Sequence, residues 1–436
     1  MKKIFFFTVV ALMMIGLIAA CGNGNGGAVG GAAGQADDEP VTITVWCWDP
    51  AFNLYAMEHA ARIYNRDVNP NVIVEIVEVP WGDIQILINT LGIAGAVDNL
   101  PDIILVQDMA FQINAISFPG LFYDLTDTAI DFTQFAPGKA GFSVVDGRNM
   151  GVPFDNGTAI FAVRTDIIAE AGFTVDDFTD ITWRQFIDRG VEVLNATGTP
   201  MFSQGIDAPD LLTMMLQSAG GSLINPDGTA NISGNAVLYQ IAEYMVDLVN
   251  SGVLLNVTGW DEYIASFIMG DVAGTIQGCW ILGSVQLAEG TEGNWAVTNV
   301  PRLEVAGGTN YTTNGGSSWA VMASSPNTDA AVSFLQHTFA GSVELYETIL
   351  PASGAIGAFL PAAGSPVYAE PHPFFDGQPV FADIVRFAGY VPPVYVGLHW
   401  YEARDLVMIE LLNIIAGDDI QTALQRAHDQ LTFVMG

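Results

Sequence analysis

The sequence predicts an α/β fold, because short β-branched segments alternate with segments of helical periodicity along its first hundred residues. A strand is predicted over 41–48, where the breaker Asp49-Pro50 ends it. The pattern continues with a helix over 52–66, a strand over 72–79, a helix over 83–94 and a short buried strand over 102–106. This β-α-β-α-β order favours a parallel sheet with helices on both faces.

The rest of the chain continues the mixture of strands and helices, without a clear internal repeat. Further strands are predicted near 158–164, 272–277, 295–300 and 317–323. Further helices are predicted near 182–195, 235–251, 260–269, 327–340, 402–415 and 418–432. The length of 436 residues is enough for two domains of common size.

The first 20 residues have the pattern of an export signal. Lys2 and Lys3 precede the apolar run 4–17, which is shorter than the roughly 20 residues that a membrane-spanning helix needs. Cys21 directly follows two alanines, and this arrangement resembles the lipobox of bacterial lipoproteins. The resemblance implies cleavage before Cys21 and lipid attachment to it. An ordinary secretory signal with an incidental cysteine is the alternative.

Residues 21–40 are predicted to be a lipid-anchored flexible linker, because they are rich in glycine and poor in large apolar side chains. The whole chain is strongly acidic, with 13 Lys plus Arg against 47 Asp plus Glu and a net charge of −34. It lacks the basic footprint of a nucleic-acid binder, and anionic lipid or polyphosphate ligands are equally disfavoured. After Cys21, only Cys47 and Cys279 remain, either as buried thiols or as a disulfide.

Polar and aromatic side chains gather where the first three predicted strands end. These residues are Trp46, Trp48, Asp49, Trp81, Asp83, Gln107 and Asp108. In open α/β sheets, ligands bind in the crevice outside the carboxyl ends of the strands. An indole ring can stack on the C–H face of a pyranose, and a carboxylate can accept two neighbouring hydroxyls. The pattern therefore favours a neutral sugar, although each single Trp is more often part of a core.

Six stretches of the chain resemble the extracellular solute-binding proteins of carbohydrate ABC transporters, which include maltose- and multiple-sugar-binding proteins. They are ITVWCWDP (43–50), LPDIILVQD (100–108), DGRNMGVPFDNGTAIFAVRTDII (146–168), MGDVAGTIQGCW (269–280), NGGSSWAVMASSPN (314–327) and HWYEARDLV (399–407). Their order along the chain is that of the family.

The resemblance implies a two-lobed periplasmic-binding-protein-like fold of type II, with a ligand cleft between the lobes and several hinge crossovers. The first lobe is expected to comprise 41–153 and 315–367, and the second lobe 154–314 and 368–436. The crossings are expected near 151–154, 311–316 and 365–375.

The strand ends and the resemblance together nominate a set of ligand-binding residues. The set is Trp48, Asp49, Trp81, Asp108, Asp155, Asn156, Trp280, Gly316, Ser317, Trp400 and Tyr401. By resemblance, Asp108 holds sugar hydroxyls, and Trp280 and Trp400 stack on sugar rings. Ala51 stands where some relatives have a basic residue, so the sugar contacts at that point differ.

The function implied is a lipid-anchored receptor on the outer face of the cell membrane, which captures a di- or oligosaccharide and delivers it to an ABC permease. It is expected to be a monomer with no catalytic residues, cofactor or metal site; the five histidines lack ligand spacing. One alternative is a secreted carbohydrate hydrolase that uses Asp49, Asp108 and Asp155 as paired carboxylates. Another is a binder of amino acids, polyamines or ferric ion. An amino-acid binder should carry an arginine for the carboxylate, and Arg148, Arg164 and Arg302 do not follow the first three strands.

Overall fold

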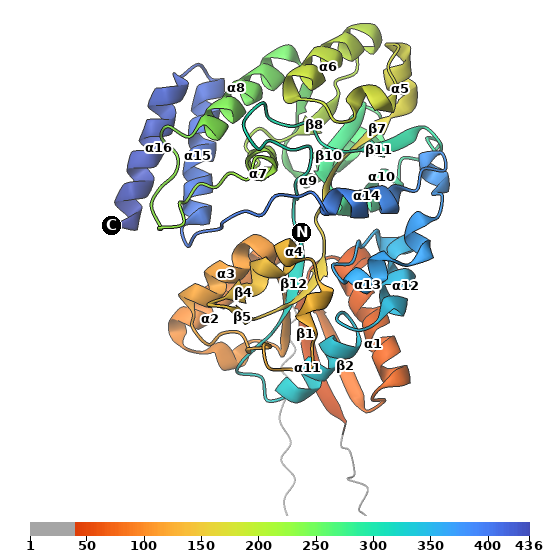
Figure 1. Ribbon diagram of the computed structural model, residues 1–436, viewed down its shortest axis with the longest axis vertical. Coiled ribbons are helices and arrows are strands. Elements are labelled where there is room, and N and C mark those ends of the chain that lie inside the picture. Colours follow the sequence, from red (N-terminus) through yellow and green to blue (C-terminus); the bar gives the residue numbers. More distant parts are fainter. Residues whose placement is uncertain (1–39) are drawn as a thin grey trace, which may run out of the picture. The chain divides into compact units, whose positions relative to one another are not determined.

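The computed structural model describes residues 40–436. These residues contain two separate groups of strands (Figure 1). The predicted signal peptide, the linker up to residue 39 and Cys21 lie outside the described residues. Within the described part, no helix is both long enough and apolar enough to cross a membrane.

The first lobe is built on a five-stranded sheet with the order β2-β1-β3-β12-β6. Its strands are β1 (Val41–Cys47), β2 (Val72–Glu78), β3 (Ile103–Gln107), β6 (Val152–Asp155) and β12 (Ser317–Val321). β1 is parallel to β2, with Val41 opposite Val72, and it is also parallel to β3. The predicted parallel order is confirmed for these three strands. The sheet as a whole is mixed, because β12 enters from distant sequence and runs antiparallel to both β3 and β6.

Helices cover both faces of this sheet. They are α1 (Tyr55–Asp67), α2 (Trp81–Ala94), α3 (Asp108–Ser117), α4 (Pro137–Ala140), α11 (Thr328–His337), α12 (Val343–Ser353) and α13 (Leu360–Ala363). Alternation along β3 explains the two layers, since successive side chains of a strand point to opposite faces. Ile103 and Leu105 pack with α1, α11 and α12, whereas Ile104 and Val106 pack with α2 and α3. A small hairpin, β4 (Val144–Val145) with β5 (Arg148–Asn149), completes the lobe.

The second lobe contains a three-stranded antiparallel sheet with the order β10-β7-β11. The strands are β7 (Ala159–Arg164), β10 (Gly274–Gly278) and β11 (Trp295–Thr298). A separate parallel pair is formed by β8 (Phe202–Gln204) and β9 (Leu254–Asn256). These two short strands were not predicted from the sequence, because three residues give no recognisable periodicity.

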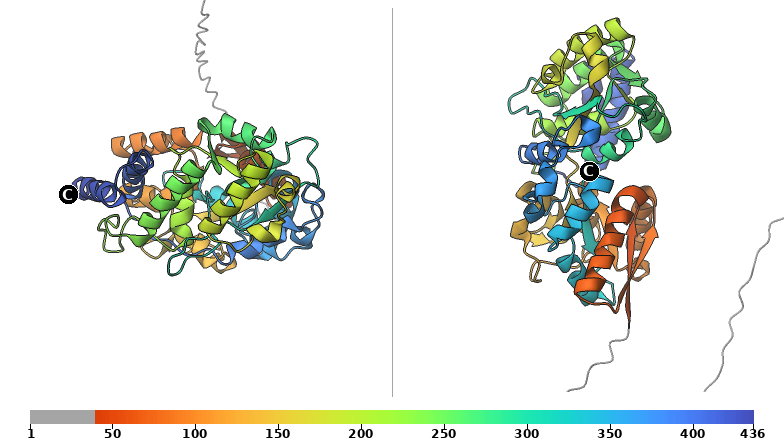
Figure 2. Two further views of the ribbon diagram at one scale, coloured as in Figure 1. Left: turned by 90° about the horizontal axis from the view of Figure 1, so that it is seen from above. Right: turned by 90° about the vertical axis from the view of Figure 1, so that its right-hand side faces the viewer.

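The helices of the second lobe pack on both sides of β7. They are α5 (Thr165–Glu170), α6 (Trp183–Thr197), α7 (Asp210–Ser218), α8 (Ala236–Ser251), α9 (Gly259–Ile268), α10 (Leu282–Val285), α14 (Val380–Ala388), α15 (Trp400–Ile415) and α16 (Ile420–Met435). Phe161 and Val163 face a core with α6, α7, α8 and α15, while Ile160 and Ala162 face α9, α10 and α14. The two C-terminal helices pack on each other, and α15 packs on α8, so the end of the chain belongs to the second lobe (Figures 1 and 2).

The chain passes between the lobes three times: two of the crossing segments are neighbours, and the third lies between α13 and α14. The first follows β6, which ends at Asp155, and reaches β7 at Ala159; the second precedes β12. They are joined by an isolated bridge between Thr158 and Thr313. The expected boundary between residues 153 and 154 therefore falls inside β6. Cys47 and Cys279 are free buried thiols that lie in the cores of different lobes, so the described residues contain no disulfide.

Candidate functional site

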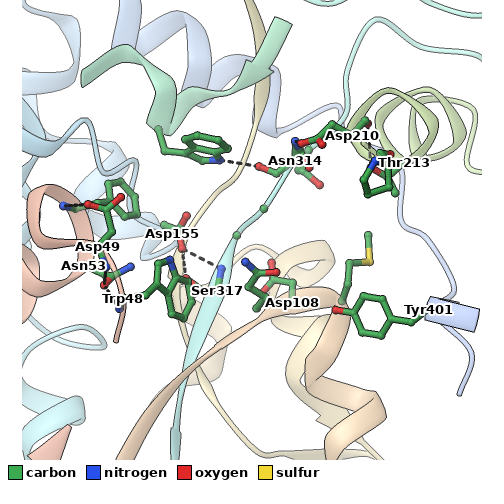
Figure 3. Close-up of a pocket in the computed structure, with 18 of the residues that line it drawn as sticks. Trp48, Asp49, Asn53, Asp108, Asp155, Asp210, Thr213, Asn314, Ser317 and Tyr401 are labelled. Atoms are coloured by element: carbon green, nitrogen blue, oxygen red, sulfur yellow. Dashed lines mark hydrogen bonds between the residues drawn. The ribbon is translucent and has the colours of Figure 1, made fainter. Parts of the chain in front are cut away.

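A cavity of about 460 Å³ lies between the two lobes, and Figure 3 shows many of the side chains around it. Its lining comes from the ends of β1, β3 and β6, from the segment before β12, and from the starts of α7, α9 and α15. The lining residues are Trp48, Asp49, Phe52, Asn53, Gln107, Asp108, Met109, Asp155, Pro209, Asp210, Thr213, Trp260, Trp280, Thr313, Asn314, Gly315, Gly316, Ser317, Trp400, Tyr401 and Arg404. The volume is within the usual range of small-molecule sites.

The end of β1 is held in place by a buried amide. Asn53 Oδ1 accepts hydrogen bonds from the backbone N–H groups of Trp48 and Asp49, both at 3.0 Å. Asp49 in turn accepts from the backbone N–H of Phe52 at 3.1 Å. The Trp48 ring packs on Trp81, with ring centroids 5.3 Å apart. The turn after β1 therefore fixes both an indole and a carboxylate at the cavity wall.

Asp108, the first residue of α3, forms a buried ion pair with Lys139 that was not predicted from the sequence. Lys139 Nζ lies 2.5 Å from both Asp108 carboxylate oxygens and donates to the Ser317 carbonyl at 2.9 Å. Both charged side chains are almost fully buried. Burial raises the pKa of Asp108 to about 6, although the ammonium of Lys139 acts in the opposite direction.

Asp155 ends β6 on the opposite side of β12 from Asp108. Its Oδ1 accepts from the Ser317 backbone N–H at 2.9 Å and from the Ser317 hydroxyl at 2.5 Å (Figure 3). Burial raises the pKa of this carboxyl group as well. The Ser317 N–H is therefore already occupied by Asp155 and is not a free donor for a ligand.

The segment before β12 contains two consecutive glycines with left-handed backbone. Gly315 and Gly316 have φ values of +85° and +93°, which side chains strongly disfavour. A Cβ atom on Gly316 would lie 2.5 Å from Asp108 Oδ2. Glycine is thus required here both by conformation and by the close approach of the Asp108–Lys139 pair.

Asp210 accepts hydrogen bonds from three amide side chains in the second lobe and the crossing segment. Its Oδ1 accepts from Asn314 at 2.5 Å and from Gln277 at 3.3 Å, and its Oδ2 accepts from Gln204 at 3.4 Å. Asn314 also donates to Gln277 Oε1. This network fixes the Asp210 carboxylate at the cavity edge, beside Thr213 (Figure 3).

Aromatic rings line the part of the cavity that the second lobe contributes. Trp280, directly after β10, donates from Nε1 to the Asn314 carbonyl at 2.9 Å, which fixes its ring. Its neighbour Trp260 is 53% exposed and lies with its ring centroid 5.7 Å from that of Trp280. Trp400 is only 2% exposed and belongs mainly to the core of the second lobe. Trp280 and Trp260 therefore offer more ring surface to a ligand than Trp400 does.

The structure brings most of the nominated residues to one cavity. Those that line it are Trp48, Asp49, Asp108, Asp155, Trp280, Gly316, Ser317, Trp400 and Tyr401. Trp81 is not among the lining residues, because as the first residue of α2 it packs beside Trp48. Asn156 lines a second cavity of about 260 Å³, and its side chain donates to the Gly357 carbonyl at 3.3 Å.

Several residues that line the cavity or contact its lining were missed because their sequence context gave little signal. Lys139 lies on a one-turn helix, and Asp210 starts a helix that was not predicted. Trp260 lies in the helix predicted near 260–269, and its position as an aromatic residue at a helix start was a signal for the site. Arg404 lies in the stretch 399–407 and also lines the cavity, but it was not among the predicted site residues. In the structure it lies over the Tyr401 ring at 4.8 Å and pairs with Asp405 at 2.6 Å. The described residues contain no cluster of three potential metal ligands.

Comparison with known proteins identifies the family. The family model for bacterial extracellular solute-binding proteins matches residues 59–373. The chain belongs to this family. A lactose-binding protein of Rhizobium radiobacter is 36% identical over 388 residues, which cover 89% of this chain and 92% of the relative.

Solved structures of sugar-binding proteins share the fold of this solute-binding protein. The GacH receptor of Streptomyces glaucescens, known unliganded and with acarbose, superposes with a TM-score of 0.76 at 19% identity, covering 91% of this chain and 99% of the other. The sugar-binding protein MalE of Xanthomonas citri gives a TM-score of 0.74 at 16% identity, with coverages of 91% and 97%. The predicted α/β, two-lobed periplasmic-binding-protein-like fold is confirmed.

Proposed function

We propose that this solute-binding protein captures a neutral di- or oligosaccharide in the cleft between its lobes and delivers it to the permease of an ABC importer. The observation that carries the proposal is the combination of indole faces and buried, hydrogen-bonded carboxylates around one cavity. The 36% identity to a lactose-binding protein supports a disaccharide or a longer saccharide as the ligand.

The chemistry of the cavity suits a sugar better than a charged nutrient. The exposed ring of Trp260, with Trp280 beside it, offers an apolar face for a pyranose, and carboxylates such as Asp210 and Asp49 offer acceptors for hydroxyl groups. Arg404, which lines the cavity, pairs with Asp405, and Lys139, which contacts the lining residue Asp108, pairs with that carboxylate. An amino-acid ligand would need such a cation for its own carboxylate, which disfavours that alternative.

The arrangement of the acids favours binding over hydrolysis. A glycosidase needs one carboxyl group as acid and a second as base or nucleophile, both available to the substrate. Asp108 is instead paired with Lys139, and Asp155 is occupied by Ser317. We therefore propose that the protein performs no chemistry on its ligand.

We also propose that Cys21 carries lipid and tethers the protein to the outer face of the cell membrane. The supporting observations are the charged start, the short apolar run and the two alanines before this cysteine. The glycine-rich residues 21–40 would then separate the binding lobes from the membrane surface.

A ligand screen tests the proposal on the mature soluble form. Thermal unfolding is followed with neutral di- and oligosaccharides, amino acids and polyamines, because a ligand that binds the native state raises its stability by mass action. A saccharide, with lactose and other disaccharides among the first tried, should raise the midpoint, and it should be recovered chemically intact after long incubation. A shift only with amino acids or polyamines, or cleavage of the sugar, would refute the proposal.

A further inference from the structure

A side pocket adjoins the ligand cleft in the second lobe and is not part of the site described above. It has a volume of about 310 Å³ and lies at the carboxyl end of β8, beside the starts of α7 and α9. Its lining residues are Gln204, Gly205, Asp207, Ala208, Asp210, Gly259, Trp260, Tyr263 and Gln277. Asp210 and Trp260 line both this pocket and the cleft, so the two spaces share a wall.

The shared wall continues the aromatic surface of the cleft. The ring centroid of Trp260 lies 5.7 Å from that of Trp280 on the cleft side and 5.3 Å from that of Tyr263 on the pocket side. Tyr263 is itself almost fully buried, so its ring is fixed. Trp260 remains 53% exposed. An exposed indole between the cleft and the side pocket is suited to contact a ligand that extends from one into the other.

The pocket contains a buried acceptor without a partner among the described residues. Gln204 is 5% exposed, and its Nε2 is directed to Asp210 Oδ2 at 3.4 Å, while its Oε1 accepts no hydrogen bond. A buried acceptor left unpaired costs free energy, and a ligand donor would satisfy it. Asp207 and Asp210 add carboxylate acceptors to the same lining. The pocket therefore suits a ligand that is rich in hydrogen-bond donors, such as a sugar ring with several hydroxyl groups.

We propose that this side pocket is an additional saccharide subsite, so that the preferred ligand is an oligosaccharide with one unit beyond those held in the cleft. The inference rests on the proposed sugar-binding function and deepens it. The extra unit contacts Trp260 with its apolar face and donates hydroxyl hydrogens to Gln204 and Asp210.

Two substitutions separate the side pocket from the cleft. Ala208→Phe fills the pocket with a bulky ring. Gln204→Leu removes the unpaired acceptor together with the donor to Asp210. Neither residue lines the cleft. The control is Ala306→Phe, which makes the same change at an exposed turn of the same lobe that lines neither space. Asp207→Ala, at an exposed position, serves as a further variant if a bulky side chain prevents folding.

Calorimetric titration of each protein with di- and trisaccharides of one linkage series tests the inference. The wild-type protein and Ala306→Phe should bind the trisaccharide at least tenfold more tightly than the disaccharide. Ala208→Phe should abolish this preference and leave the disaccharide affinity within twofold, and Gln204→Leu and Asp207→Ala should reduce the preference at least threefold. Equal affinities for both sugars in the wild-type protein, or a preference unchanged in all three pocket variants, would overturn the inference while the proposed function stands. Binding of no saccharide would overturn both.

Discussion

Trp280 and Trp400 were nominated for the same role, but the structure gives them different surroundings. Trp280 is held by a hydrogen bond to the Asn314 carbonyl and lies beside the exposed Trp260. Trp400 is one of the largest fully buried side chains of the second lobe. The sequence could place an aromatic residue at the cleft, but it could not show how much of each ring the core would cover.

We expect Trp280→Ala to weaken sugar binding more than tenfold, which corresponds to about 1.4 kcal/mol, because the stacking surface is lost. Trp400→Ala should mainly destabilise the fold, by about 3–5 kcal/mol, because it leaves a cavity in the core. Calorimetry and urea unfolding of both variants distinguish the two effects. Wild-type affinity in Trp280→Ala would contradict the stacking role.

The buried pair of Asp108 and Lys139 gives a second prediction. Lys139→Met should lower the free energy of unfolding by about 3–5 kcal/mol at neutral pH, because Asp108 then either stays a buried carboxylate without its counter-ion or takes up a proton. Adding Asp108→Asn in the same protein should restore a large part of that loss. Urea unfolding of the single and double variants measures both effects. A double variant no more stable than Lys139→Met would show that the charge of Asp108 is not the cause.

The same carboxyl group makes stability depend on pH. Burial raises the pKa of Asp108 from 3.8 to about 6, so the folded state favours the protonated form. Its contribution to stability is fully present below pH 3.8 and is lost as the pH rises through 6. The free energy of unfolding of the wild-type protein, relative to that of Asp108→Asn, should therefore fall between pH 4 and pH 6. A difference that stays constant across this range would contradict the raised pKa.

At the scale of the elements, sequence periodicity found the regular strands but only part of their arrangement. The alternation in 41–48 and the breaker pairs around the early strands were sufficient to predict β1, β2, β3 and their parallel order. Periodicity could not reveal that β12 lies between β3 and β6, because strand pairing at such separation depends on tertiary packing. The same limit explains why Lys139 was not connected with Asp108, 31 residues away.

The crossing segment before β12 allows a test of backbone conformation. Gly316→Ala should destabilise the protein by about 3 kcal/mol, because it combines a positive φ with a Cβ atom 2.5 Å from Asp108 Oδ2. Gly293→Ala is the matched control: its φ is +81°, but nothing lies within 4 Å of the added atom. We expect the control to cost about 1 kcal/mol. Equal losses in both variants, measured by urea unfolding, would show that the contact with Asp108 is unimportant.

At the scale of the whole molecule, two lobes joined by crossing segments should close on the ligand as a hinge. Saccharide should reduce the radius of gyration of the mature soluble form, measured by small-angle scattering. The Trp280→Ala variant at the same sugar concentration controls for effects of the sugar on the solvent. An unchanged scattering curve for the wild-type protein at saturating ligand would exclude closure and leave a rigid cleft.

The proposed anchor is tested in the intact cell. Cys21→Ala should release the protein to the medium or leave it unprocessed, because lipid attachment requires the cysteine. Fractionation followed by mass spectrometry of the N-terminus gives both results. Retention of the cleaved variant at the membrane would contradict lipid anchoring.

The position of β12 also has a consequence for biosynthesis. β3 and β6 are joined only through β12, yet 161 residues separate the end of β6 from the start of β12. At roughly 5–20 residues per second, a ribosome needs about ten to thirty seconds to make that stretch. During this time the first lobe lacks its connecting strand and cannot complete its sheet. A nascent chain that stops short of Val321 therefore lacks the strand that joins β3 to β6.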